Sequence, residues 1–246
     1  MSSLGDRLDG IIDEAWAVAR TAGTYLAGIK DPHDEDSIEL VTCPPGALVC
    51  HLTPVILVHG FSANWASWFP LLRALRDAGY VRFVRFNYDS GSSAREIAGD
   101  LGVRIGEVLA HTGASRVHLV GHSLGGVTSR LYVTELGGDK VLGAAVSLGG
   151  PVNGTPWGRL PVGIPHALAE LKPGSELVKL MAGAADDRTR WTTIAGDQDI
   201  LVPPTYARIE GATNNVIAGL GHVGLLWSDT VLEMVREALL ALEATP

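Results

Sequence analysis

One short stretch, residues 116–130, constrains the fold of this chain more than any other: RVHLVGHSLGGVTSR. Its first half alternates apolar residues, which is typical of a strand, and its second half has helical spacing. Gly-His-Ser-Leu-Gly, residues 121–125, joins the two. A turn this sharp strains the backbone of Ser123, and it brings helix and strand so close that side chains at Gly121 and Gly125 would collide. The turn holds the serine hydroxyl clear of the strand at a helix N-terminus, where free N–H groups favour negative charge.

The rest of the chain alternates strand and helix patterns from Pro54 onward. The continuous apolar run at 54–60 is typical of a strand buried on both faces. Such alternation predicts a single α/β domain with a doubly wound, mostly parallel sheet. The expected strands are 54–60, 81–88, 117–120, 141–150, 191–196 and 214–219, and the expected helices are 67–78, 92–111, one that runs from the serine to about 136, and 229–242.

Two segments lie outside this alternation, although we expect residues 1–246 to form one domain. Residues 1–50 comprise an amphipathic helix at 6–29, followed by an acidic, then Pro/Gly-rich connector at 30–50. Residues 151–190 hold five prolines and no obvious strand. Insertions of this length are usually functional, and the segment is a candidate lid. The apolar positions of the expected N-terminal helix are Leu8, Ile11, Ile12, Ala15, Trp16 and Ala19.

Charge and composition exclude several classes of partner. The net charge is −8, and no run of Lys or Arg suggests nucleic acid. No stretch reaches the roughly 20 apolar residues of a membrane span. The N-terminus as written has no apolar signal-peptide core, which favours the cytoplasm, or secretion if a leader has been removed.

The two cysteines, Cys43 and Cys50, flank a Pro-Gly loop, TCPPGALVC. A disulfide across this loop and a pair of free thiols both remain open. Their spacing fits neither a metal site nor a C-x-x-C redox motif. We expect no metal and no cofactor.

A serine hydroxyl becomes a good nucleophile only beside a base that a carboxylate orients. Two histidines follow Ser123, and His222 lies in a Gly-rich segment after an expected strand, whereas His166 lies in the insertion. For the acid, GDQDILVPP offers Asp197 and Asp199. We predict Asp199, because Asp197 suits a turn cap.

An oxyanion formed at the serine needs N–H donors. The backbone N–H of Leu124 follows the serine directly. A second donor is expected from Phe61, after the strand at 54–60, where Gly60 allows close approach. His59 and His122 are interpreted as structural histidines.

Four segments, VILVHGF, VGHSLGG, DQDILV and GLGHVGLLWS, together resemble bacterial α/β-hydrolase lipases of the compact Bacillus type and the actinobacterial type. The resemblance covers residues 54–240, weakly over 151–190, and it implies the α/β-hydrolase fold with the insertion after the family's sixth strand. It also implies Ser123 as nucleophile, Asp199 as acid, His222 as base, and oxyanion donors on Phe61 and Leu124.

Two departures limit what carries over from the compact group. Its serine turn begins with Ala where this chain has Gly121. Its minimal members also lack the first 50 residues and a long insertion, so their lidless behaviour does not transfer.

The resemblance implies hydrolysis of carboxylic esters, most of all acylglycerols, by a triacylglycerol lipase that works through an acyl-enzyme. Trp65, Ile200 and Val223 are candidate substrate contacts. A small-ester carboxylesterase, a thioesterase and an acyltransferase share the chemistry, and a non-catalytic binding protein is the rival of another class. The expected partner is a small ester or lipid, with transient contact at a lipid interface but no membrane insertion; the oligomeric state is left open.

Overall fold

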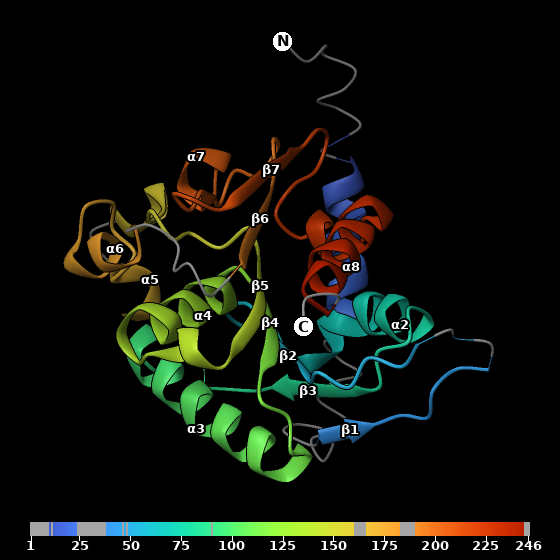
Figure 1. The fold of residues 1–246 in the computed structure, drawn as a ribbon. Coiled ribbons are helices and arrows are strands. Elements are labelled where there is room, and N and C mark those ends of the chain that lie inside the picture. The colour runs from blue at the N-terminus through green and yellow to red at the C-terminus, as the bar shows by residue number, and fades with distance from the viewer. Residues whose placement is uncertain are drawn as a thin grey trace.

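The computed structural model describes residues 10, 12–23, 38–45, 47, 49–89, 91–159, 166–182 and 190–243. Its centre is a seven-stranded sheet in the order β1-β3-β2-β4-β5-β6-β7. Among the described strands, β1 and β3 pair antiparallel, and the other neighbours pair in parallel. The predicted doubly wound, mostly parallel sheet is therefore confirmed (Figure 1).

The elements follow one another much as their sequence patterns predict. The strands are β1 (Ile38–Leu40), β2 (Val55–Val58), β3 (Arg82–Phe86), β4 (Val117–His122), β5 (Leu142–Leu148), β6 (Arg190–Gly196) and β7 (Thr213–Ile217). After the N-terminal helix, the α-helices are α2 (Phe69–Asp77), α3 (Ala94–Thr112), α4 (Leu124–Glu135), α5 (His166–Ala169), α6 (Glu176–Met181), α7 (Pro204–Ala207) and α8 (Asp229–Glu243). Short 3-10 turns are η2 (Trp65–Trp68), η3 (Gly138–Lys140), η4 (Pro156–Arg159) and η5 (Gly224–Leu226).

Two hydrophobic cores cover the two faces of the sheet. One is formed mainly by strand residues with α3, α4 and α6, and the other by strand residues with α2 and α8. Figure 1 shows these helices on opposite sides of the sheet. All four residues of β2 are buried, as the apolar run in the sequence predicts.

Strand β1 departs from the sequence prediction, because its residues fall inside the segment predicted to be a connector. It pairs with β3 at the sheet edge, with Glu39 opposite Phe83. The Glu39 carboxylate forms ion pairs with Arg76 and with Arg85, whose side chain is 4 % exposed. Distant partners hold this strand, through the pairing with β3 and the ion pairs of Glu39. Its three residues are too few to show the alternating pattern that predicts a strand.

The N-terminal helix is present at residues 12–23, but the prediction of its packing face is wrong. Ile12 and Trp16 are 53 % and 64 % exposed, and Ala15 and Ala19 are exposed as well. Leu8 and Ile11 lie outside the described residues. The helix instead packs through a narrower and more polar face, described below.

The insertion follows β5, which is the fifth strand in this chain's own order. Its described residues hold η4, α5 and α6. Helix α6 packs on α4, where the buried Arg130 Nε donates to the Met181 carbonyl at 3.1 Å. The Thr155 hydroxyl donates to the Leu201 carbonyl at 2.7 Å. The parts of the insertion on either side of residues 160–165 thus contact the body of the domain.

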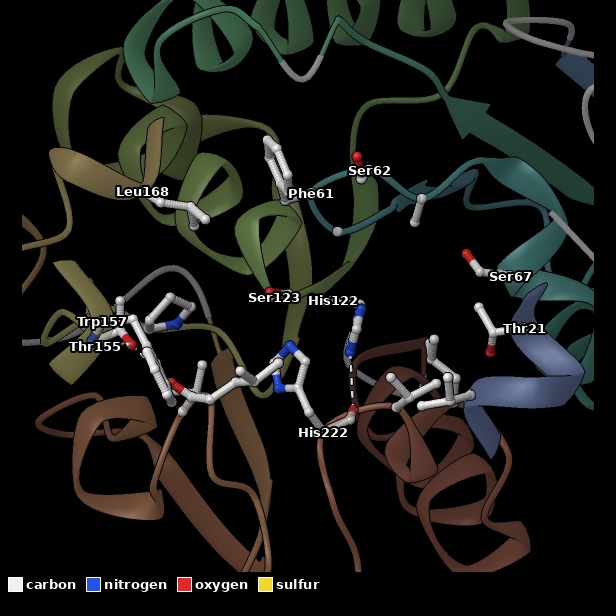
Figure 2. Close-up of a pocket in the computed structure, with 18 of the residues that line it drawn as sticks. Thr21, Phe61, Ser62, Ser67, His122, Ser123, Thr155, Trp157, Leu168 and His222 are labelled. Carbon is white, nitrogen blue, oxygen red and sulfur yellow. Dashed lines mark hydrogen bonds between the residues drawn. The ribbon is translucent and has the colours of Figure 1, made fainter. Parts of the chain in front are cut away.

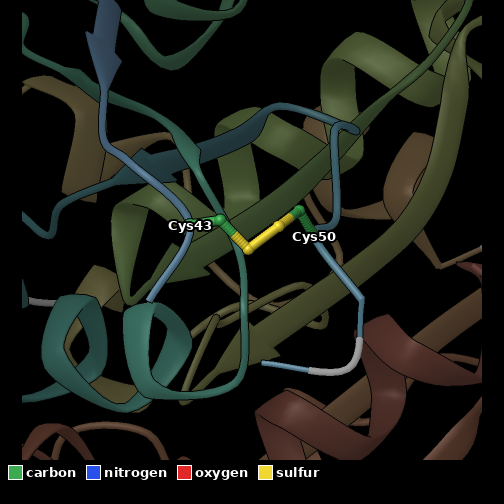
Figure 3. Close-up of a disulfide and its surroundings, with 2 residues drawn as sticks. All are labelled: Cys43 and Cys50. Atoms are coloured by element: carbon green, nitrogen blue, oxygen red, sulfur yellow. A yellow bond between two sulfur atoms is a disulfide. The ribbon is translucent and has the colours of Figure 1, made fainter. Parts of the chain in front are cut away.

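The structure joins Cys43 and Cys50 by a disulfide, with Cα atoms 5.8 Å apart (Figure 3). The bond closes the short loop between β1 and β2. No helix in the described part of the chain combines the length and apolar character that crossing a bilayer requires.

Candidate active site

The turn between β4 and α4 has the strained geometry that its glycines predict. Ser123 has φ 53° and ψ −119°, in the region that L-residues rarely occupy. A Cβ atom on Gly121 would collide with the backbone of Gly125, and one on Gly125 would collide with the Val58 carbonyl oxygen. Both glycines are therefore needed for the close approach of α4 to β2 and β4, which presents Ser123 at the helix N-terminus.

The structure brings His222 and Asp199 together. The His222 Nδ1 atom lies 2.6 Å from Asp199 Oδ2, and both side chains are buried. Because an ionised carboxylate only accepts, Nδ1–H donates, and Nε2 is left with a free lone pair. Asp199 Oδ1 accepts from the backbone N–H groups of Leu201 and Val202 at 2.9 and 2.7 Å. The carboxylate is thus fixed on both of its oxygens.

The two alternatives from the sequence have other contacts. Asp197 is exposed, and its Oδ1 accepts from the Gly219 N–H at 2.7 Å, as a turn cap would. The side chain of His166 is 66 % exposed and lies 3.8 Å from Glu170 in an ion-pair geometry. Neither contacts Asp199 or His222 among the described hydrogen bonds, so the geometry favours Asp199 and His222.

Ser123 and His222 line one cavity of about 650 Å³. Figure 2 shows the His222 ring pointing toward Ser123. Among the hydrogen bonds of the described residues, none joins the Ser123 hydroxyl to His222. Serine–base contacts are often long in ligand-free sites and tighten when substrate binds, so the arrangement is compatible with proton transfer.

His122 supports the backbone of His222. Its Nε2–H donates to the His222 carbonyl oxygen at 3.1 Å, and the two ring centroids lie 4.8 Å apart (Figure 2). Burial, and then the neighbouring His222, lower the pKa of His122 to about 3. The ring therefore stays neutral at ordinary pH, in agreement with a structural histidine.

The loop after β2 reaches the cavity next to Ser123. A Cβ atom on Gly60 would lie 3.0 Å from His122 Nδ1 and 3.1 Å from Ser123 Cβ, which explains the glycine. His59 Nδ1 lies 2.8 Å from the Gly60 carbonyl oxygen, so His59 braces the loop backbone as expected. Ser62, just after Phe61, has φ 54°, a second strained residue at this edge of the cavity.

Phe61 and Leu124, the predicted oxyanion donors, lie on the two segments that flank Ser123. Leu124 is the first residue of α4, where backbone N–H groups have no partner within the helix. Phe61 lines the cavity beside Ser123. Both predicted donor segments therefore lie next to Ser123: Leu124 follows it in the chain, and the loop that carries Phe61 approaches it at Gly60.

The substrate contacts predicted from the sequence are only partly found at the cavity. Val223 lines it. Trp65 does not: its ring is 5 % exposed, packs edge-on against Phe69 and lies under the Arg85 guanidinium at 4.5 Å. Ile200 is 76 % exposed and outside the lining, although its carbonyl accepts from Trp157 Nε1 at 3.0 Å. Trp65 is therefore buried against Phe69 and Arg85 and does not face the cavity.

Several lining residues lie on segments far apart in the sequence. The insertion supplies Pro151, Thr155, Trp157 and Leu168, the segment after β6 supplies Leu201 and Val202, and the N-terminal helix supplies Val18, Thr21 and Ala22. The apolar side chains of the insertion are the sequence signal that could have indicated Trp157 and Leu168 as cavity residues. No local pattern marks the N-terminal helix as part of the cavity wall. Within the described residues, no cluster of three or more His, Cys, Asp or Glu could hold a metal ion.

Comparison with known proteins agrees with the fold. Residues 53–174 match the family model of the alpha/beta hydrolase fold. With the sheet described above, this match shows that the chain has the α/β-hydrolase fold. In sequence it is similar to bacterial triacylglycerol lipases.

Two curated triacylglycerol lipases, from Pseudarthrobacter phenanthrenivorans and Burkholderia plantarii, are each 35 % identical over 112 residues. These residues make up 42 % of this chain and 34 % and 30 % of those proteins, so the chain spans about a third of the curated relatives it matches. The propeptide form of Bacillus licheniformis lipase BlEst2 superimposes with a TM-score of 0.66 at 18 % identity, covering 82 % of this chain and 53 % of that one. At this identity the superposition shows the shared fold alone.

Proposed function

We propose that this protein is a serine hydrolase that cleaves carboxylic esters through an acyl-enzyme on Ser123, with acylglycerols as its main substrates. The observation that carries the proposal is the 2.6 Å contact between His222 and Asp199 in the wall of a cavity that Ser123 also lines. A nucleophile, a base and an orienting carboxylate in this order are the parts that acyl transfer requires.

In the proposed first half-reaction, the Ser123 oxygen attacks the ester carbonyl while its proton moves to His222 Nε2. A C–O bond forms and the carbonyl becomes a tetrahedral oxyanion. The backbone N–H groups of Leu124 and Phe61 stabilise that charge. Asp199 stabilises the resulting imidazolium through Nδ1–H.

The intermediate then collapses. The bond to the leaving alcohol breaks, and His222 gives this alcohol the proton, which leaves an acyl-serine. Water repeats the sequence: His222 takes its proton, the water oxygen attacks the acyl carbon, and the proton returns to Ser123 as the acid departs. This series of steps needs no cofactor.

The character of the cavity supports a lipid as the substrate. Its walls are dominated by apolar side chains, including Phe61, Leu168, Leu201, Val202 and Leu226. Apolar walls with few convergent polar groups suit an acyl chain with one reacting ester. Two relatives carry the name triacylglycerol lipase, which agrees with this substrate class.

The test is hydrolysis of p-nitrophenyl esters from C2 to C16 by wild type and three variants. Ser123→Ala removes the nucleophile. Asp199→Asn is paired with Asp197→Asn, which removes a carboxylate two residues away at an exposed turn. We expect Ser123→Ala to abolish turnover, Asp199→Asn to lower kcat by about 10⁴-fold, and Asp197→Asn to stay close to wild type.

The chain-length profile separates the substrate classes. Activity that extends to long acyl chains supports a lipase, and activity confined to C2–C4 replaces it with a small-ester esterase. Faster acyl transfer from a thioester would favour a thioesterase. If Ser123→Ala keeps the wild-type rate, the serine mechanism is wrong, and a wild type inactive on all esters favours a binding protein.

A further inference from the structure

The N-terminal helix docks through a narrow face that its apolar pattern does not predict. Gly10 and Ala17 are buried, and Glu14 and Thr21 are partly buried, at spacings of four, three and four residues. Such spacing keeps the four residues on one side of a helix. Two of them are polar, and each forms a specific hydrogen bond with the segment that follows His222.

Glu14 makes the more important of these contacts. Its Oε1 accepts from the Val223 N–H and its Oε2 from the Gly224 N–H, each at 2.8 Å. These are the first two backbone donors after His222, and they begin the η5 turn. Hydrogen bonds from neutral donors to a carboxylate are stronger than those between neutral groups. One side chain, more than 200 residues away in sequence, therefore fixes the backbone beside His222.

A second contact anchors the helix near its end. Trp227 Nε1 donates to Thr21 Oγ1 at 2.9 Å, and the Arg20 guanidinium lies 5.7 Å from the centre of the Trp227 ring. Trp227 directly follows η5. The helix thus holds the His222 segment at two points, and Figure 1 draws it in blue beside α8.

The segment that carries His222 needs such support, because glycines stand at 219, 221 and 224. Gly219 has φ 78°. The His222 ring is fixed by Asp199, and its carbonyl oxygen is held by His122. Glu14 supplies a further restraint, on the backbone immediately after the histidine.

The absence of a side chain at Gly221 leaves the space that the Glu14 carboxylate occupies. A Cβ atom there would collide with the Glu14 carboxylate group. The φ of Gly221 is not in the positive region, so a small side chain is compatible with its backbone conformation. An alanine at 221 would therefore displace Glu14 without altering Glu14 itself.

We propose that Glu14 is a positioning residue for His222: its carboxylate, carried by the N-terminal helix, holds the Val223 and Gly224 N–H groups and so sets the aim of the imidazole at Ser123. The inference rests on the proposed serine mechanism. It makes the N-terminal helix part of the catalytic apparatus rather than an outer covering of the domain.

The test compares Glu14→Gln with Asp13→Asn. Glutamine keeps the length of the side chain but replaces one accepting oxygen with an NH₂ group, whereas Asp13→Asn removes the same charge from the exposed neighbour on the same helix. For each variant, kcat and KM are measured with p-nitrophenyl acetate and octanoate. The rate at which a small alkyl fluorophosphonate labels Ser123 is measured per folded molecule, with the folded fraction taken from circular dichroism.

We expect Glu14→Gln to lower kcat and the labelling rate by about 10- to 100-fold on both esters, because displacement of a catalytic group by about 1 Å costs on this order. KM should change by less than about 2-fold. Asp13→Asn should match wild type. Gly221→Ala should lower kcat in the same way. Combining it with Glu14→Gln should add little, because both changes disturb the same contact of the Glu14 carboxylate with the Val223 and Gly224 N–H groups.

The inference is overturned if folded Glu14→Gln is labelled at the wild-type rate, even when its melting temperature falls, since Glu14 then serves stability alone. It is equally overturned by a loss confined to octanoate, which would mean a damaged acyl wall, or by fully additive effects of Gly221→Ala and Glu14→Gln. If wild-type Ser123 resists the fluorophosphonate and turns over no ester, the proposed function itself fails.

Discussion

At the residue scale, the surroundings of His122 keep this one histidine neutral. Its Nε2–H must donate to the His222 carbonyl oxygen, and its ring is 6 % exposed beside a second imidazole. Charging it would place a buried cation next to His222, the proposed base. Burial and His222 hold its pKa at about 3, so a catalytic pH dependence near neutrality does not arise from His122.

This lowered pKa has a consequence for stability. The unfolded chain binds a proton at about pH 6.5, but the folded chain does not until about pH 3, so stability is lost as pH falls through this window. From pH 7 to pH 5 the His122 contribution falls by about 2 kcal/mol. His122→Gln keeps an N–H donor but cannot titrate, so we expect it to lose that much less stability over the same interval.

Urea unfolding of wild type and His122→Gln at pH 7 and pH 5 checks this. Each protein serves as its own reference, because the comparison is between two pH differences. Equal pH dependence in the two proteins would show that His122 titrates normally in the folded state.

At this scale, the sequence predicts the residues of the candidate triad but few of the contacts that hold them in place. Ser123, Asp199 and His222 lie in local patterns that a strand-to-helix fold must place at one sheet edge. The burial of Trp65 depends on Arg85 and Phe69, and the contact of Glu14 depends on a segment more than 200 residues away. No local pattern contains such pairings.

At the element scale, the packing of α4 against the sheet rests on the absence of side chains at the serine turn. A methyl group on Gly125 would collide with the Val58 carbonyl oxygen on β2. Gly106, in α3, is exposed, and apart from its chain neighbours and the backbone of its own helix, a methyl group added to it would have no heavy atom within 4 Å. The same substitution should therefore have opposite effects at the two sites.

We expect Gly125→Ala to lower the free energy of unfolding by several kcal/mol, about 3 or more, and to abolish ester turnover. Gly106→Ala should raise the free energy of unfolding by about 0.5–1 kcal/mol, because alanine is the better helix former. Denaturant unfolding and ester hydrolysis measure both. A Gly125→Ala protein of wild-type stability and activity would contradict the close packing described at the turn.

The disulfide is the element-scale feature that the sequence left undecided. Closing a loop of seven residues' separation removes freedom from the unfolded chain and should stabilise the fold by about 2 kcal/mol. Neither cysteine lines the cavity, so we expect Cys43→Ser/Cys50→Ser to lose that stability and keep the wild-type kcat. Thiol titration in denaturant should find no free thiol before reductant is added and two after it. Two titratable thiols without reductant would exclude the bond.

Elements with strong periodicity were predictable, and those held by distant partners were not. The helices α3 and α8 lie within about two residues of their predicted bounds. The three-residue strand β1 is held by pairing with β3 and by ion pairs of Glu39, so composition alone made it a connector. The N-terminal helix was predictable, but hydrogen bonds rather than apolar spacing decide which face it buries.

At the scale of the whole molecule, the cavity is assembled from segments that sequence distance keeps apart: the N-terminal helix, the loop after β2, the insertion, and the segments after β6 and β7. Figure 2 shows Thr21 and Trp157 on opposite sides of Ser123. The sequence identifies each of these segments, but no local pattern shows that they meet at one cavity. For this reason the substrate contacts were the least predictable part of the site.

Trp157 tests whether this assembled wall selects the acyl chain. Its ring lines the cavity, is 44 % exposed overall, and is oriented by its hydrogen bond to the Ile200 carbonyl. Figure 2 draws Trp157 apart from Ser123, so we expect that an acetyl group does not reach it and that a longer chain buries surface against it. Trp157→Ala should therefore lower kcat/KM for p-nitrophenyl octanoate by about 10-fold, which corresponds to about 1.4 kcal/mol of lost apolar contact, and leave the acetate within about 2-fold of wild type.

Leu136→Ala, a similarly exposed apolar truncation at the end of α4, is the control that should change neither ester. An equal loss on both esters would instead place the effect of Trp157 on the catalytic groups, and an unchanged octanoate rate would remove the insertion from the acyl site.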